Sequence, residues 1–88
     1  MNKYAIVLTP EATKDIRHLD VDTATRILDK LAWMGKNAEL LRHQSLRANE
    51  WSGCFKYRVG DYRIIYQVNQ IGKKLIILKV GHREQIYK

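Results

Sequence analysis

The amino-acid sequence predicts an α+β fold in the order β-α-α-β-β-β. Apolar residues recur at helical spacing only between residues 9 and 35, and alternate as in a β-strand only after residue 53. Because the helices come first and an antiparallel β-meander follows, we expect both helices to cover one face of a single sheet. The length of 88 residues fits one core, so we predict a single domain at residues 1–88.

The first segment predicts a strand followed by a short helix. Tyr4–Leu8 is β-branched and apolar on both faces, which is typical of a buried strand. Thr9 is the expected N-cap because its hydroxyl can accept a free backbone N–H, and Pro10 suits the first helical position. One apolar stripe follows, made of Ala12, Ile16 and Leu19.

A second helix is predicted directly after the first, which makes a two-helix hairpin. Asp20 and Asp22 are alternative N-caps. We expect Gly35 to end this helix. Its apolar positions follow the i, i+3, i+4, i+7 pattern and are Ala24, Ile27, Leu28 and Leu31. Residues 36–50 have no clear period and predict a loop.

The second half predicts three antiparallel strands. Phe55, Tyr57 and Val59 point to one face, and the two-residue turn Gly60–Asp61 leads into the next strand. That strand has an apolar face as well, formed by Tyr62, Ile64, Tyr66 and Val68. The last strand, Leu75–Val80, is apolar on both faces and is expected to be central.

Registering the hairpin about Gly60–Asp61 gathers positive charge on one face. Lys56, Arg58 and Arg63 fall on the face away from the apolar side chains, and Arg58 lies directly opposite Arg63. Like charges in that position are unfavourable, so stability does not explain the arrangement. A bound anion would relieve the repulsion.

Composition also favours an anionic partner. The chain has 16 Lys and Arg against 9 Asp and Glu, a net charge of +7, and nine of these basic residues with only three acidic ones lie in residues 45–88. Nucleic acid is the first expectation and acidic protein the second. A single cysteine, the lack of a secretory h-region and the lack of an apolar run of about 20 residues indicate a cytoplasmic chain without a membrane partner.

Three stretches resemble the RelE/ParE superfamily of bacterial and archaeal type II toxins. They are GCFKYRVGDYRIIYQV at Gly53–Val68, VGHREQIYK at Val80–Lys88, and the helical hairpin that precedes them. The resemblance covers essentially the whole chain and implies the RelE-like fold. The RelE branch of this superfamily cuts mRNA in the ribosomal A site, whereas the ParE branch inhibits DNA gyrase without cutting RNA.

The RelE-like pattern implies a set of site residues. Its basic residues on the second and third strands, its arginine after the last strand and its C-terminal tyrosine match Lys56, Arg58, Arg63, Arg83 and Tyr87. We expect these five to be catalytic and the four cations among them to bind RNA. His82 is an alternative acid or base to Tyr87, and Tyr87 could instead stack on a base of the RNA.

These residue types suit RNA cleavage without a metal. The 2′-hydroxyl attacks the adjacent phosphorus, and preorganised guanidinium groups stabilise the charge that develops on the phosphate oxygens. Arg63 and Arg83 are the candidates for this, and Lys56 is the candidate base. The sequence has no His/Cys ligand spacing and no Gly-rich phosphate loop, so we expect no metal and no cofactor.

The resemblance also implies partners. We expect a cognate antitoxin that is acidic and partly disordered, the ribosome and mRNA as targets, and operator DNA only through the antitoxin complex. The leading interpretation is a ribosome-dependent mRNA endonuclease that inhibits translation. A ParE-like inhibitor of DNA gyrase that is not an enzyme, and an inactive member that binds only its antitoxin and operator DNA, are the alternatives.

Overall fold

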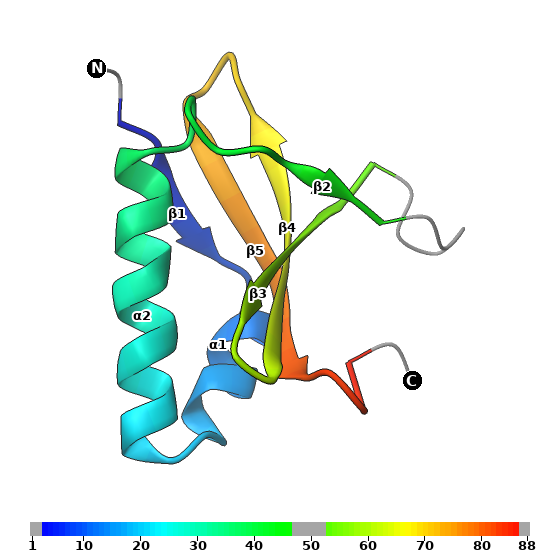
Figure 1. The fold of residues 1–88 in the computed structure, drawn as a ribbon. Helices are drawn as coiled ribbons and strands as arrows, with labels where there is room; N and C mark the ends of the chain where they lie inside the picture. Colours follow the sequence, from blue (N-terminus) through cyan, green and yellow to red (C-terminus); the bar gives the residue numbers. More distant parts are fainter. Residues whose placement is uncertain (1–2, 47–52, 87–88) are drawn as a thin grey trace.

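The fold is a five-stranded mixed sheet with two helices on one face (Figure 1). A computed structural model describes residues 3–46 and 53–86. The strands lie in the order β1-β5-β4-β3-β2; β1 is parallel to β5, and the other neighbours are antiparallel. The predicted α+β class is confirmed. The elements are β1 Ala5–Leu8, α1 Pro10–Arg17, α2 Val21–Lys36, β2 Gln44–Ser45, β3 Phe55–Val59, β4 Tyr62–Asn69 and β5 Lys74–His82.

Both helices begin at capping side chains. Thr9 caps α1 as predicted, because its hydroxyl accepts a hydrogen bond of 3.1 Å from the backbone N–H of Ala12. Of the two alternatives for α2, Asp20 is the cap, and its carboxylate accepts from the N–H of Thr23 at 3.2 Å. No helix within the described part of the chain is long and apolar enough to cross a membrane.

Helix α2 does not end at Gly35, as the sequence suggested, but continues to Lys36. The glycine serves close packing instead: a Cβ at this position would lie 2.6 Å from the carbonyl oxygen of Tyr4. The Gly35 carbonyl in turn accepts a hydrogen bond of 2.8 Å from the Tyr4 N–H. A second correction in this helix is Leu28, which lies on the solvent side at 46% exposure.

The two edge strands also differ from expectation. Strand β1 was expected to be buried on both faces. It lies instead at the edge of the sheet, and its Val7 is exposed. Strand β2 falls within the predicted loop at residues 36–50 and pairs Gln44 with Lys56 and Ser45 with Phe55. Two residues are too few to show an alternating pattern, which is why this strand was not predicted.

The main core lies between the helices and the sheet. Ile27 and Leu31 of α2 pack there against Ile64, Tyr66 and Ile77 of the sheet. The predicted register of the β3–β4 hairpin is confirmed at every pair from Phe55–Tyr66 to Val59–Tyr62. The sheet therefore presents its other side chains, Lys56 and Arg58 among them, away from the helices.

The face of the sheet away from the helices is called the far face below. The sequence predicted that this face would be uncovered, but part of it is covered. A second apolar cluster, formed by Cys54, Ile65 and Ile86 with Leu46 and Leu78 packed against it, covers part of it. Ile86 comes from the turn that follows β5 and is 1% exposed. The C-terminal turn thus folds back over the sheet.

Candidate nucleic-acid interface

The far face carries two rows of side chains that run across the strands. In one row Lys56 of β3 pairs with Ile65 of β4, and Ile65 pairs with Lys79 of β5. In the other row Arg58 pairs with Arg63, and Arg63 pairs with Gly81. Paired residues share a face of the sheet. The structure therefore brings together Lys56, Arg58 and Arg63, as the hairpin register predicted.

Arg63 is held by the turn that precedes it. Its side chain is mostly buried, at 8% exposure for the residue. Its Nη1 donates to the carbonyl oxygens of Gly60 at 3.0 Å and Tyr62 at 2.9 Å. These carbonyl dipoles offset part of the repulsion from Arg58, and they fix the guanidinium before any ligand arrives.

Arg83 lies at the same end of the sheet as this turn. Its backbone N–H donates to the carbonyl oxygen of Asp61 at 2.8 Å, and its Nε lies 3.8 Å from Oδ1 of the same residue. Both side chains are exposed, so this ion pair contributes little stability and a phosphate can replace it. Arg83 is thus available to a ligand at the end of the sheet where Arg58 and Arg63 lie.

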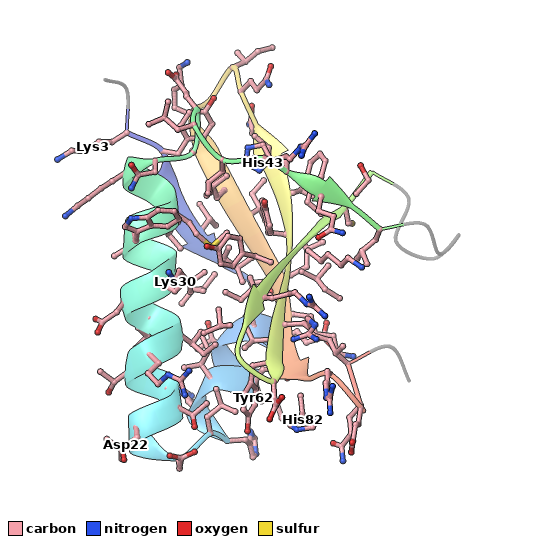
Figure 2. The ribbon with its side chains drawn as sticks, in the orientation of Figure 1. Lys3, Asp22, Lys30, His43, Tyr62 and His82 are labelled. Carbon is pink, nitrogen blue, oxygen red and sulfur yellow. The ribbon has the colours of Figure 1, made fainter. Side chains whose placement is uncertain are left out.

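His82 is not brought to these cations. It pairs with Tyr62, which packs on the helix side of the core, and the two rings meet edge to face with centroids 5.5 Å apart (Figure 2). Its Nδ1 accepts a hydrogen bond of 3.2 Å from the N–H of Glu84. Tyr87, the other candidate acid, lies outside the described residues.

Lys79 is a member of the cationic face that the sequence reasoning missed. Strict alternation from Leu75 and Ile77 would place Lys79 toward the helices, but the register shifts between the partners of Ile65 and Tyr66. This β-bulge leaves Leu78 unpaired and turns Lys79 to the far face and Val80 to the core. Every position from Leu75 to Leu78 is apolar, so the local sequence gives no signal of this change of face.

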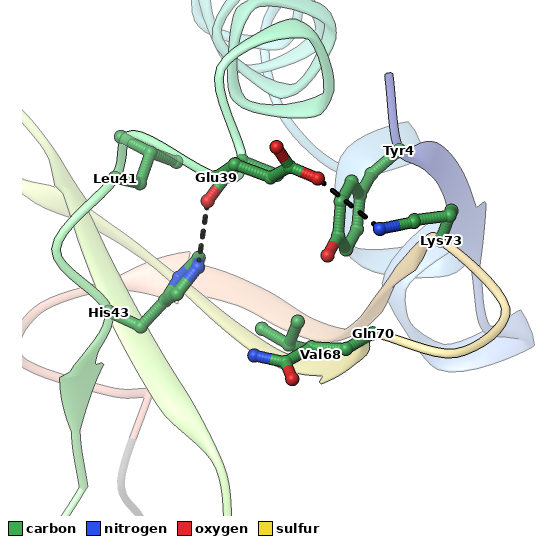
Figure 3. Close-up of a pocket in the computed structure, with 8 residues that line it drawn as sticks. Tyr4, Glu39, Leu41, His43, Val68, Gln70 and Lys73 are labelled. Atoms are coloured by element: carbon green, nitrogen blue, oxygen red, sulfur yellow. Dashed lines mark hydrogen bonds and ion pairs between the residues drawn. The ribbon is translucent and has the colours of Figure 1, made fainter. Parts of the chain in front are cut away.

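A separate hollow of about 330 Å³ lies on the helix side, between the end of α2 and the β4–β5 turn (Figure 3). Its charged groups are paired with one another, because Lys73 Nζ lies 3.3 Å from a carboxylate oxygen of Glu39. The same ammonium lies over the Tyr4 ring, 5.4 Å from its centroid. This hollow therefore offers an anion much less free charge than the far face does.

The arrangement on the far face can bind a phosphodiester and stabilise added negative charge on it. Two exposed arginines, Arg58 and Arg83, and two half-buried lysines, Lys56 and Lys79, lie on this face or at its end together with the preoriented guanidinium of Arg63. Among residues 3–46 and 53–86, no three His, Cys, Asp or Glu side chains are grouped to hold a metal ion.

The fold and its cationic sheet face define a small basic α+β protein with arginines and lysines gathered on the sheet surface away from the helices. The family described as "ParE toxin of type II toxin-antitoxin system, parDE" matches residues 6–87. The chain therefore belongs to the RelE/ParE superfamily of toxins of type II toxin–antitoxin systems.

Individual relatives are RelE-type toxins. The chain is 28% identical over 85 residues to toxin RelG of Mycobacterium tuberculosis, covering 97% of each chain. Its fold matches a toxin in a RelBE-type toxin–antitoxin complex of the same organism with a TM-score of 0.83, at 25% identity and 94% coverage of each chain. An archaeal RelE from a complex with RelB in Pyrococcus horikoshii matches with a TM-score of 0.74 at 24% identity, covering 97% of this chain and 99% of that one.

Proposed function

We propose that this toxin is a ribosome-dependent mRNA endonuclease that cleaves RNA by metal-independent attack of the 2′-hydroxyl on the adjacent phosphate. The observation that carries the proposal is the shared sheet face of Lys56, Arg58 and Arg63, with Arg83 at the same end. Such a group can neutralise the charge that develops on the scissile phosphate.

Each residue receives a role from its place in this group. Arg63, already oriented by the turn carbonyls, and Arg83, which can exchange Asp61 for phosphate, stabilise the transition state. Lys56 takes the 2′-hydroxyl proton, and Arg58 binds the adjoining backbone. We assign the protonation of the leaving 5′-oxygen to Tyr87 rather than His82, because the His82 ring faces Tyr62 on the helix side.

The site supports dependence on a large partner. The far face is a partly covered sheet surface that carries cations, and among the described residues it has no opposed pair of His and carboxylate, so it does little to align the RNA by itself. A ribosome that holds the mRNA for in-line attack would supply that alignment. The chain's net charge of +7 suits docking to ribosomal RNA.

We further propose a cognate antitoxin as the protein partner. Related toxins of this fold are known in complexes with RelB antitoxins. An acidic, partly disordered antitoxin would complement the cations of the far face, and it would carry any contact with operator DNA.

A second candidate is inhibition of DNA gyrase. The specific observation in its favour is that the matching family description is that of ParE toxins. In that case the toxin acts by binding, and its effect survives the joint loss of Lys56, Arg58 and Arg83. Growth arrest with intact mRNA and an induced DNA-damage response would identify this activity.

The deciding experiment is in vitro translation with the purified toxin, in which primer extension maps new 5′ ends on the mRNA. Arg83→Ala should lower the cleavage rate about 100- to 1,000-fold because one group that stabilises the phosphate charge is lost. Its thermal unfolding should stay near that of the wild type, since the Arg83 side chain is exposed. Arg17→Ala, an exposed change on α1, is the control and should cleave normally. Wild-type protein that leaves mRNA intact would refute the proposal.

A further inference from the structure

The β-bulge in β5 gives Lys79 a place that no matching motif assigns. Because of the bulge, Lys79 lies across Ile65 from Lys56, in one row over β3, β4 and β5. Neighbouring strands are about 4.8 Å apart, so the two lysine Cα atoms are separated by about 10 Å. Two cations thus face the same side with one apolar residue between them.

Lys79 forms no ion pair within the described residues, so its charge is available to a ligand. The ion pairs within residues 3–46 and 53–86 are Lys73–Glu39 and Arg83–Asp61, and neither involves Lys79. Leu78 and Ile65 beside it belong to the second apolar cluster, and Lys79 itself is half-buried. Lysine stems commonly lie along such apolar surface and keep the ammonium in water. A charge supported in this way is suited to binding an anion.

We propose that Lys79 binds an RNA phosphate next to the scissile one and holds the strand across the sheet; this inference rests on the proposed function. The row from Lys56 to Lys79 runs perpendicular to the β-strands, so an RNA strand that crosses the sheet meets both lysines in turn. An ammonium on a flexible stem recognises a phosphate charge without reading a base. Lys79 is therefore a binding residue for the backbone.

The test compares Lys79→Gln with Lys74→Gln. Lys74 is the matched control because it precedes buried Leu75 on the same strand and the same sheet face, about 16 Å away. The probe is a 2′-O-methyl oligoribonucleotide, which binds but cannot be cleaved. We expect Lys79→Gln to weaken binding about fivefold and to reduce the salt slope of log K by about 0.7, while Lys74→Gln leaves both near wild type.

A second readout separates binding from chemistry. On programmed ribosomes, Lys79→Gln should raise KM more than it lowers kcat, and Lys79→Arg should restore both. Equal effects of the two glutamine variants, a loss confined to kcat, or wild-type protein that does not bind the oligoribonucleotide would each overturn the proposal. Wild-type protein that binds the oligoribonucleotide but cleaves no mRNA would refute the nuclease function, while the binding comparison would still decide the role of Lys79.

Discussion

The side chains of His43 and Tyr66 form a polar contact inside the helix-side core. Tyr66 is fully buried, and Nδ1 of His43 lies 2.7 Å from its hydroxyl oxygen. Nε2 of His43 lies 3.0 Å from the carbonyl oxygen of Ala38, which only accepts, so Nε2 donates and Nδ1 accepts from Tyr66. The contact fastens the segment between α2 and β2 to β4.

This contact predicts how stability changes at alkaline pH. Burial, with a smaller contribution from the neighbouring Tyr57, raises the pKa of Tyr66 from its ordinary 10.0 to about 12. As pH rises the unfolded chain loses this proton first, so the folded state binds more protons in that range. The free energy of unfolding contributed by Tyr66 is therefore retained below pH 10 and falls between pH 10 and about 12.

Urea unfolding between pH 8 and 11 measures the effect. Wild type should lose stability more steeply above about pH 9.5 than Tyr66→Phe, which has no phenol to titrate there. At pH 7 the same variant should be less stable by about 1–2 kcal/mol, because His43 loses its donor. Tyr62→Phe serves as the control and should follow the wild-type curve. Parallel curves for wild type and Tyr66→Phe would contradict the prediction.

At the scale of elements, Thr9 joins α1 to the sheet. Its hydroxyl accepts from the Ala12 N–H and donates to the carbonyl oxygen of Ile77 at 2.9 Å, so one side chain connects the helix start to β5. Thr9→Val keeps the shape and removes both bonds. We expect the free energy of unfolding to fall by about 1–3 kcal/mol, with the urea midpoint as the measurement.

Thr25→Val provides the comparison for that variant. Thr25 is exposed on α2, and the same exchange there should stay within about 0.5 kcal/mol of wild type. If both variants lose the same amount, the cost reflects the chemical exchange and not the junction between α1 and β5.

The predictability of the elements follows from the strength of their periodic signals. The β3–β4 register could be read from the Gly60–Asp61 turn because the core-facing apolar residues recur at every second position on both strands. The edge position of β1 could not, since a parallel partner from the far end of the chain decides it. Gly35 looked like a helix end because local sequence does not show the approach of Tyr4.

At the scale of the molecule, most of the excess positive charge lies in the part of the chain that forms the sheet face away from the helices. Residues 45–88 hold nine basic and three acidic residues, and they supply β3, β4 and β5, whose far side the helices leave uncovered. The cations of β3 and β4 could be grouped from sequence because one tight turn links those strands. The places of Lys79 and His82 could not, because each depends on the bulge in β5, for which the local sequence has no separate signal.

This arrangement predicts that the location of charge, and not its total, controls RNA binding. Two triple variants to glutamine each lower the net charge of +7 by three, one on the far face and its end, the other on the helices. The first changes Lys56, Arg58 and Arg83, and the second changes Lys14, Arg17 and Lys36. With the 2′-O-methyl oligoribonucleotide, the first should reduce the salt slope of log K by about 2, since each lost phosphate contact removes about 0.7, and the second by less than 1. Equal slopes would mean that binding follows net charge alone, and the far face would then not be the RNA-binding surface.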